Sequence, residues 1–325
     1  MAHALNVVVV VLPGVMGSTL RDKDGKEVWG TSVGSLVKAV LTRGKAAKRL
    51  QLPAGIGDSP APDGVVATGL VPDIHVIPGI WSVSIGYEQM IKWFRDTFDV
   101  VEEGRDDPSR PANFVQFPYD WRLSNRASAS ALRTRIEPVL EHFRATPGHA
   151  DAKVVFVGHS MGGLVARYYV DVLGGHEITR KVITLGTPHR GALNALVSLV
   201  NGISKGVGPL KIDLSNLARS LPALYQLLPE YACIESPAGL RKTTELTLPE
   251  LGAAEVADAM RFHEELRSGA ALHAGAYDSH PILARTQPTD TTARLSGGKV
   301  TALRTIDGRD EAGDGTVPRL SASPY

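Results

Sequence analysis

The sequence predicts an α/β fold, with a mostly parallel β-sheet and helices on both of its faces. Three observations indicate this class. Short apolar, β-branched runs alternate with stretches of helical periodicity. The first run is apolar throughout, as in parallel strands buried on both faces. The chain also has 33 Gly and 21 Pro in 325 residues, which indicates many shaped loops.

The predicted elements follow one another in regular order. Val7–Leu12 is a run of six apolar residues that meets Pro13-Gly14, as in a buried strand that ends in a turn. Leu132, Ile136 and Leu140 are spaced as on one face of a helix. We expect further strands at 113–117, 153–157, 181–185 and 299–304, and helices at 128–144 and 162–173.

The alternation stops between about Gly191 and Gly298, where helical patches and Pro-Gly turns show no clear strand ladder. This stretch predicts a cap inserted over one end of the sheet. We therefore expect a core at 1–190, a cap at 191–298, and the end of the core at 299–325.

Charge and cysteine content exclude several classes of function. With 35 basic and 34 acidic residues, the chain lacks the positive field of a nucleic-acid-binding protein. A single cysteine, Cys233, permits neither an internal disulfide nor a Cys-rich zinc site. The first apolar run is shorter than a secretory signal or a membrane span requires. These features predict a cytoplasmic protein without a metal site.

The stretch Thr31–Gly57 contains five basic residues and no acidic one. Apolar positions such as Leu36, Val40 and Leu50 lie roughly along one helical face. Two interpretations stay open. The stretch is a surface helix that packs this stripe on the core, or it is an interfacial helix in peripheral contact with an anionic lipid surface.

The strongest chemical motif is Gly158-His159-Ser160-Met161-Gly162, which fits G-x-S-x-G. An apolar strand precedes it and a helical pattern follows it, which is the setting of a nucleophile elbow. In such an elbow the serine occupies a strained turn that exposes its hydroxyl, and glycines avoid collisions with the neighbouring chain. Ser160 is the predicted nucleophile.

A serine nucleophile needs two backbone N–H groups that stabilise the oxyanion. One comes from the residue after the nucleophile, Met161, at the start of a helix. The other comes from a loop after an earlier strand. Pro13-Gly14-Val15-Met16-Gly17 follows the first strand and is rich in glycine, so we expect the Val15 N–H to be the second donor.

The general base should be a histidine held by a carboxylate. Asp314, in Gly313-Asp314-Gly315-Thr316-Val317-Pro318, is the candidate acid, with Asp307 and Asp310 as alternatives. No histidine follows Asp314 in the remaining eleven residues. His189 lies just past a predicted strand and is a candidate for substrate contact or for loop packing. We expect the last strand, the catalytic histidine and the last helix to lie beyond Tyr325.

Several strings together resemble the lecithin:cholesterol acyltransferase family, which includes lysosomal phospholipase A2 and phospholipid:diacylglycerol acyltransferases. Tyr119-Asp120-Trp121-Arg122 and Gly313–Pro318 are more specific than the serine motif. The others are Pro13–Ser18, Gly158–Gly163, Thr184–Pro188 with Arg190–Ala192, and Leu221–Pro229.

The resemblance implies an α/β-hydrolase fold with a cap and a small membrane-contacting subdomain, here at 31–57. It implies Ser160 as nucleophile, Asp314 as acid, and the Val15 and Met161 amides as the oxyanion hole. Family members form an acyl-serine from a lipid ester and pass the acyl group to an alcohol or to water, without a cofactor. Asp120 and Arg122 are expected to form a structural ion pair near the site.

The leading hypothesis is a serine-dependent lipid acyl hydrolase or O-acyltransferase that acts on a lipid ester or phospholipid. Two alternatives stay open. The chain is a non-catalytic lipid-binding protein on a hydrolase fold, or it is a small-ester esterase. A histidine encoded past Tyr325 would favour the enzyme, and chain-length preference on simple esters would separate the two kinds of enzyme.

Overall fold

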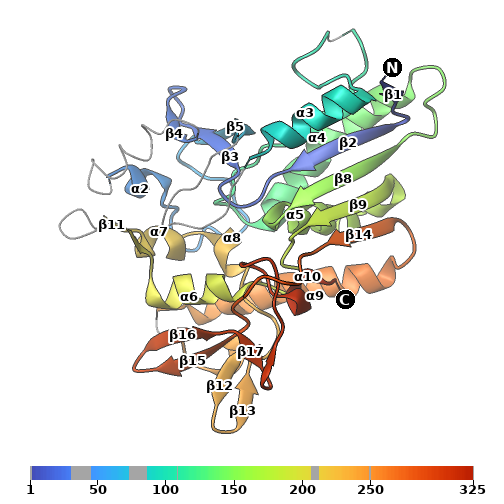
Figure 1. The fold of residues 1–325 in the computed structure, drawn as a ribbon. Helices are drawn as coiled ribbons and strands as arrows, with labels where there is room; N and C mark the ends of the chain where they lie inside the picture. Colours follow the sequence, from blue (N-terminus) through green and yellow to red (C-terminus); the bar gives the residue numbers. More distant parts are fainter. Residues whose placement is uncertain are drawn as a thin grey trace.

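The computed structural model describes residues 2–30, 45–72, 86–107, 109–205, 212–248 and 250–324. Its centre is a five-stranded sheet in which every neighbouring pair of strands is parallel. The strand order is β14-β9-β8-β2-β7 (Figure 1). The bounds are Asp278–Ile282 for β14, Thr179–Leu185 for β9, Lys153–His159 for β8, Val7–Leu12 for β2 and Phe114–Gln116 for β7.

Strand β2 explains why helices lie on both faces of this sheet. All six residues of β2 are buried, and they alternate between two hydrophobic clusters. Val8, Val10 and Leu12 face the cluster that includes α4 (Asn125–Arg144) and α5 (Met161–Asp171). The other three residues of β2 face the cluster that includes α3 (Glu88–Thr97). The prediction of a parallel sheet with helices on both faces is confirmed.

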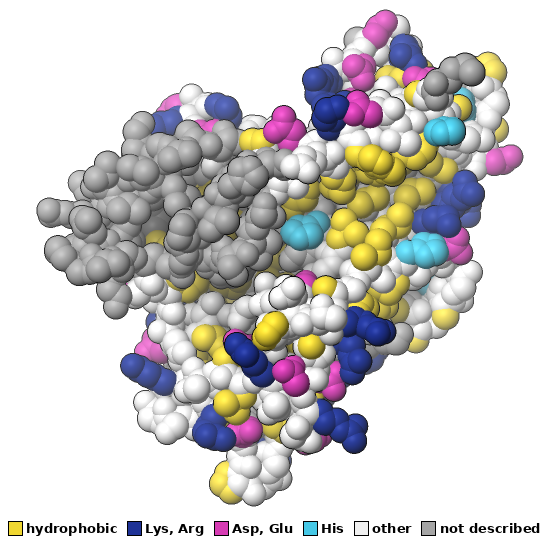
Figure 2. All heavy atoms as spheres, in the orientation of Figure 1, with side chains coloured by type: hydrophobic (Ala, Val, Ile, Leu, Met, Phe, Trp, Pro, Cys, Tyr) yellow, Lys and Arg dark blue, Asp and Glu magenta, His cyan; other side chains and the backbone are white. Residues whose placement is uncertain are grey.

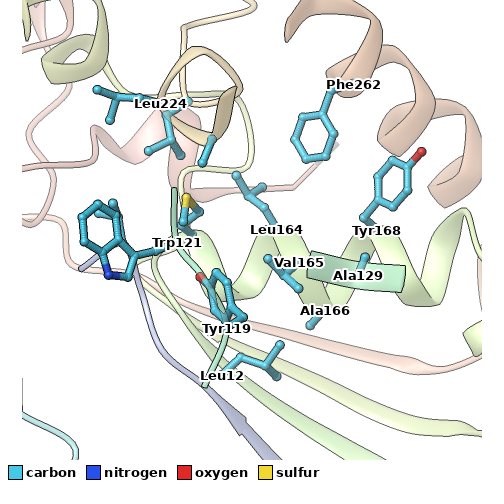
Figure 3. Packing of buried hydrophobic residues seen from close by; sticks show 14 of the residues in the cluster. Leu12, Tyr119, Trp121, Ala129, Leu164, Val165, Ala166, Tyr168, Leu224 and Phe262 are labelled. Atoms are coloured by element: carbon cyan, nitrogen blue, oxygen red, sulfur yellow. The ribbon is translucent and has the colours of Figure 1, made fainter. Parts of the chain in front are cut away.

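The helix α4 begins and packs as its sequence indicates. Ser124 is its N-cap, and the side chain accepts a hydrogen bond from the Ala127 N–H at 3.1 Å. Leu132, Ile136 and Leu140 are buried at helical spacing. Figure 3 shows how this layer continues, with Leu164 and Val165 of α5 on the side of Leu12 and Tyr119. Tyr168 of α5 stacks on Phe262 of a second long helix, with ring centroids 5.4 Å apart.

One predicted strand of the parallel sheet lies elsewhere. Lys299–Leu303 (β16) belongs to a four-stranded sheet of order β13-β12-β15-β16, where it pairs antiparallel with β15 (Thr292–Ser296). The other two strands of this sheet are β12 (Ile234–Ser236) and β13 (Gly239–Arg241). The expectation that it continues the core sheet is wrong. Its pattern alternates, with Val300 buried between exposed Lys299 and Thr301, and alternation is typical of antiparallel strands with one solvated face.

The fifth strand of the central sheet is β14, which lies inside the stretch predicted to be a cap. It pairs with β9 from Asp278↔Lys181 to Ile282↔Leu185. Its residues are mostly exposed and include Pro281, and proline in a strand is confined to edge positions. The chain therefore leaves the sheet after β9, returns for β14 and leaves again. The division into core, cap and core end stays a prediction.

The remaining elements form smaller units around the sheet (Figure 1). Two helices of the excursion, α6 and α9, join the main hydrophobic cluster through Leu196, Leu199, Ala259 and Phe262. The helices are α2 Lys45–Leu50, α6 Leu193–Asn201, α7 Ser215–Arg219, α8 Pro222–Tyr225, α9 Ala253–Leu272 and α10 Arg319–Ala322. The short strands are β1 His3–Ala4, β3 Ser18–Arg21, β4 Glu27–Trp29, β5 Val66–Leu70, β6 Phe98–Asp99, β10 Ser204–Lys205, β11 Ile212–Asp213, β12 Ile234–Ser236, β13 Gly239–Arg241, β17 Thr305–Ile306 and β18 Arg309–Asp310.

Apolar side chains also reach the surface on the α3 side of the central sheet. Figure 2 shows them gathered where Figure 1 places β2, β8 and β9. Val155, Ile183 and Leu185 are half-buried there, and Ile282 on the edge strand is 57% exposed. Within the described ranges, none of the helices is both long enough and apolar enough to cross a membrane.

Most of the basic stretch Thr31–Gly57 lies outside the described residues. Its described part begins with α2 at Lys45, after which Lys48 and Arg49 are exposed and Leu50 is buried. The end of the stretch therefore has Leu50 and Leu52 buried in the core and the charges of Lys48 and Arg49 on the surface. Both interpretations of the stretch remain predictions.

Candidate active site

The turn at Ser160 has the backbone of a nucleophile elbow. β8 ends at His159 and α5 begins at Met161, so Ser160 alone connects strand and helix. Its φ of 51° and ψ of −124° form a combination that residues other than glycine rarely adopt. The Ser160 N–H donates to the Leu185 carbonyl at 2.9 Å, which fixes the turn to the end of β9. Ser160 therefore lies at the carboxyl edge of the parallel sheet.

The glycines around Ser160 are required by close contacts, as the motif predicts. A Cβ atom on Gly158 would lie 2.6 Å from the Gly163 Cα, and one on Gly162 would lie 2.3 Å from the Pro13 carbonyl oxygen. Gly163 is equally confined, because its Cβ would lie 2.0 Å from the Thr187 Oγ1. The elbow is thus in close contact with the turn after β2 on one side and with the loop after β9 on the other.

The loop after β2 packs directly on the elbow. A Cβ atom on Gly14 would lie 2.9 Å from the Ser160 Cβ. The loop turns sharply, since the Gly17 N–H donates to the Gly14 carbonyl at 3.0 Å and Met16 has a φ of 63°. Among the described residues, the amides of Val15 and Met161 donate to no other protein group. Both are available for an oxyanion, and that role stays a prediction.

Three side chains hold this loop, and the sequence did not single them out for that purpose. The Tyr119 hydroxyl donates to the Pro13 carbonyl at 2.7 Å, and the Trp29 Nε1–H donates to the Met16 carbonyl at 2.9 Å. The Gly14 N–H donates to the Tyr87 hydroxyl at 2.7 Å. Tyr119 belongs to the Tyr-Asp-Trp-Arg string, so its contact could have been suspected. Tyr87 and Trp29 carry no comparable signal.

The rest of that string forms a buried ion-pair cluster. Arg122 is fully buried and pairs with Asp120 at 2.7 Å and with Asp63 at 2.6 Å. It also donates to the Leu50 carbonyl at 3.3 Å. The expected ion pair of Asp120 with Arg122 is confirmed. Because the guanidinium has no exposed surface, its position is that of a structural group that anchors the Asp63 and Leu50 segments.

Asp314 lies at the same edge of the sheet as Ser160. A Cβ atom on Gly186, the residue after β9, would lie 2.8 Å from the Asp314 Oδ2. Gly186 follows Leu185, which accepts the hydrogen bond from the Ser160 N–H. The Asp314 Oδ1 accepts from the N–H groups of Thr316 and Val317 at 2.8 Å and 2.7 Å. The structure thus brings the predicted nucleophile and acid to neighbouring strand ends.

The two alternative acids have different surroundings. Asp307, with a φ of 49°, is in the turn between the short paired strands β17 and β18. Asp310 is on β18, and its Oδ1 accepts a hydrogen bond from the Ala312 N–H at 2.8 Å. The Asp307 side chain is part of this hairpin, and the Asp310 side chain bonds to the segment that follows it. Asp314 is the candidate whose carboxylate contacts the end of a central strand.

His189 is a buried residue with the surroundings that the loop-packing alternative predicts. It is 1% exposed. The Arg167 guanidinium donates to its Nδ1 at 3.3 Å, and its Nε2 bonds to the Thr184 Oγ1 at 3.1 Å. Burial, together with the Arg167 charge, lowers the pKa of His189 to about 3. Both ring nitrogens are occupied by the protein, so His189 joins α5 to β9.

The other described histidines with assigned contacts also bond elsewhere. The His159 Nδ1 bonds to the Tyr87 hydroxyl at 2.8 Å, and the His263 Nε2–H donates to the Leu228 carbonyl at 3.1 Å. His273 stacks on His176, and His280 is exposed on β14. None of these hydrogen bonds and ring contacts includes Ser160 or Asp314, although the Asp314 carboxylate is close enough to His159 to oppose the lowering of its pKa by burial. In the described ranges, no group of three or more His, Cys, Asp or Glu side chains could hold a metal ion.

Comparison with known proteins places this geometry in a family. The model of the lecithin:cholesterol acyltransferase family matches residues 93–266, more than half of the chain. The chain belongs to the lecithin:cholesterol acyltransferase family. The matched segment contains the Tyr-Asp-Trp-Arg string and the Ser160 elbow, whereas the Val15 loop and Asp314 lie outside it.

Two further proteins are similar. The uncharacterised protein YJR098C of Saccharomyces cerevisiae is 29% identical over 181 residues, which is 55% of this chain. The chain spans about a quarter of that relative's length, 23%. A chain in the crystal structure of the Tle4–Tli4 complex superposes with a TM-score of 0.63 at 18% identity, over 99% of this chain and 89% of that one. The fold is that of the α/β hydrolases.

Proposed function

We propose that the protein is a serine-dependent acyl hydrolase or O-acyltransferase that acts on lipid esters. The observation that carries the proposal is the strained elbow at Ser160, with the Gly14 loop packed on it and the Asp314 carboxylate at the next strand end. Membership of the lecithin:cholesterol acyltransferase family supports an acyl group as the transferred unit and a lipid as its donor.

The proposed reaction has two halves. The Ser160 hydroxyl attacks the ester carbonyl carbon while a base accepts its proton, and the Val15 and Met161 N–H groups stabilise the oxyanion. The intermediate collapses, and the donor alcohol leaves with that proton. Water or an acceptor alcohol then attacks the acyl-serine in the same way and releases a free acid or a new ester.

The proposal requires a base, and no histidine in the described ranges hydrogen-bonds to Ser160 or to Asp314. We propose that a histidine outside them occupies the position between Ser160 and Asp314, with its imidazole held by the Asp314 carboxylate. That carboxylate already accepts two backbone hydrogen bonds on its Oδ1, and its Oδ2 faces the end of β9. A non-catalytic lipid-binding protein would have no use for this arrangement.

A covalent probe tests the nucleophile in the full-length native chain. A fluorophosphonate should label Ser160, and Ser160→Ala should lose both the labelling and at least about 10⁴-fold of ester turnover. Ser268→Ala, an exposed serine on α9, is the control and should behave as wild type. If the Ser160→Ala variant were labelled as strongly as the wild type, Ser160 would not be the nucleophile. Preference for long over short acyl chains would separate a lipid enzyme from a small-ester esterase.

We also propose that the end of the basic stretch contacts an anionic lipid surface. Lys48 and Arg49 are exposed in the last turn of α2, and each basic residue near such a surface contributes about 1 kcal/mol. Reversal of both charges to Glu should weaken binding to phosphatidylserine vesicles at least about 30-fold, because loss of the two positive charges alone costs about 2 kcal/mol, without a change in turnover of a soluble ester. Reversal at exposed Lys299 and Arg309 is the matched control, and an equal loss there would show a general charge effect.

A further inference from the structure

One tyrosine links the loop of the Val15 amide to the turn of Ser160. The Tyr87 hydroxyl oxygen accepts the Gly14 N–H at 2.7 Å, and it bonds to the His159 Nδ1 at 2.8 Å. Gly14 directly precedes Val15, and His159 directly precedes Ser160. The other two anchors of the loop, Tyr119 and Trp29, bond to Pro13 and Met16 through carbonyl oxygens of the loop itself. Only the Tyr87 contact, of these three, also holds the elbow.

The number of protons defines the direction of these bonds. A tyrosine hydroxyl has one hydrogen to donate, and its oxygen already accepts from the Gly14 N–H. We infer that this hydrogen is donated to the His159 Nδ1, because an Nδ1–H would leave the hydrogen of the buried hydroxyl without an acceptor. The imidazole is then neutral, with its proton on Nε2. Burial favours this state: it raises the pKa of Tyr87 above its usual value, and it lowers the pKa of His159, although the nearby Asp314 carboxylate opposes the second shift.

The space around Gly14 explains why the bond matters for geometry. A Cβ atom on Gly14 would lie 2.9 Å from the Ser160 Cβ and 3.1 Å from the His159 Nδ1, and one on Gly17 would lie 2.9 Å from the Tyr87 hydroxyl. Tyr87 is 3% exposed, and its ring meets the His159 ring edge to face with centroids 5.8 Å apart. Loop, tyrosine and elbow are thus in direct contact.

We propose that Tyr87 and His159 form a positioning pair that sets the Val15 N–H relative to the Ser160 hydroxyl. The inference rests on the proposed acyl-transfer function. Neither residue of the pair is proposed to touch the reacting atoms, and the pair acts through Gly14. An oxyanion donor contributes about 10²–10³-fold to kcat, and a displacement of about 1 Å can remove about 10² of rate. Loss of the pair should therefore lower kcat with little change in KM.

The first test is Tyr87→Phe in the full-length chain, which keeps the buried ring and removes the hydroxyl. On a soluble short-chain ester, kcat should fall about 10–100-fold while KM changes less than about twofold. Affinity for a trifluoromethyl ketone, which forms a tetrahedral oxyanion on the serine, should fall by a similar factor. The control is Tyr169→Phe, which removes a hydroxyl that bonds to Glu137 and should leave kcat unchanged. Wild-type kcat in Tyr87→Phe would overturn the proposal.

A second pair of variants separates the hydrogen bond from packing. His159→Asn places an Oδ1 acceptor near the position of the Nδ1, whereas His159→Leu has the same shape without an acceptor. We expect kcat of the Asn variant to exceed that of the Leu variant by about tenfold or more. Equal kcat values in the two variants would show that His159 acts through its volume alone, and the proposal would be wrong.

A spectroscopic measurement distinguishes failure of the pair from failure of the proposed function. The ¹⁵N chemical shifts of His159 in the wild-type protein should show the neutral Nε2–H tautomer, and Tyr87→Phe should lose this preference. An Nδ1–H tautomer in the wild type overturns the pair whatever the enzyme does. If the tautomer is as expected but neither turnover nor Ser160 labelling is found in the full-length chain, the proposed function fails and the positioning role fails with it.

Discussion

The two sides of the candidate site are built in different ways. Ser160 and the Gly14 loop lie between buried strands and helices, with glycines that permit no added carbon. Asp314 is exposed, and its Oδ1 accepts hydrogen bonds from two amides of its own loop. The core therefore sets the position of the nucleophile, whereas local turn geometry sets that of the acid.

The acid loop is nevertheless tied to the sheet edge at several points. Gly313 pairs with Gln287 through two backbone hydrogen bonds of 3.1 Å and 3.0 Å. α10, which follows the loop, is joined to the loop after β9, because the Arg190 N–H donates to the Ser321 carbonyl at 3.3 Å. These contacts are hydrogen bonds between main-chain atoms, and the Asp314 side chain takes no part in them. We therefore expect substitutions at Asp314 to change the chemistry without a change in folding, and substitutions at the elbow glycines to change folding first.

The largest effect expected from this contrast is on turnover at Asp314. In the Ser-His-Asp template, Asn in place of the acid lowers kcat about 10⁴-fold, because the imidazole loses its tautomer and the partner of its charge. Asp314→Asn in the full-length chain should lower kcat by that order, with an unfolding midpoint close to that of wild type. Steady-state kinetics and thermal unfolding of the same preparation measure the two quantities.

The matched controls for this variant are Asp307→Asn and Asp310→Asn, a few residues earlier in the same exposed segment. Each should retain kcat within about threefold, since both side chains belong to the β17–β18 hairpin. If either variant loses about 10⁴-fold of kcat while Asp314→Asn stays active, the catalytic acid is that residue of the hairpin and not Asp314. A large fall in stability of Asp314→Asn would show that the acid loop is part of the folding core.

The same contrast explains which parts were predictable from the sequence. The elbow and the first strand were, because an uninterrupted apolar run and a G-x-S-x-G motif are local signals. β14 was not, because its exposed residues and Pro281 resemble a loop. The contacts of Tyr87 with Gly14 and of Arg122 with Asp63 join segments 73 and 59 residues apart. Such pairs depend on how the chain returns to the sheet, and no spacing in the sequence encodes them.

A smaller effect is expected on stability at the elbow. Gly162→Ala places a carbon 2.3 Å from the Pro13 carbonyl oxygen, a backbone atom that cannot rotate away. The resulting strain should lower the free energy of unfolding by about 1–3 kcal/mol, measured by urea denaturation. Gly69→Ala is the control and should change stability by less than about 1 kcal/mol. Among the described residues, apart from Gly69 and its two chain neighbours, no heavy atom lies within 4 Å of the carbon added there. Similar losses of unfolding free energy in both variants would contradict the conclusion that close packing fixes the position of the Ser160 elbow.

The smallest effect is expected on the pH dependence of the free energy of unfolding, through a buried residue on the Ser160 side of the site. There His189 joins Arg167 of α5 to Thr184 of β9. Burial lowers its pKa to about 3 in the folded protein, whereas an unfolded histidine titrates near about 6.5. Between these values the unfolded state binds more protons. The stability associated with neutral His189 is therefore complete above about pH 6.5 and is lost as the pH falls from there through about 3. At pH 5.5 this loss is on the order of 1 kcal/mol.

His189→Gln should remove that part of the difference in unfolding free energy between pH 7.5 and 5.5, because glutamine does not titrate. His280→Gln, at an exposed position on β14, should leave the difference unchanged. If His189→Gln keeps the full pH dependence, another buried group carries it and the role of His189 in this side of the site is packing alone.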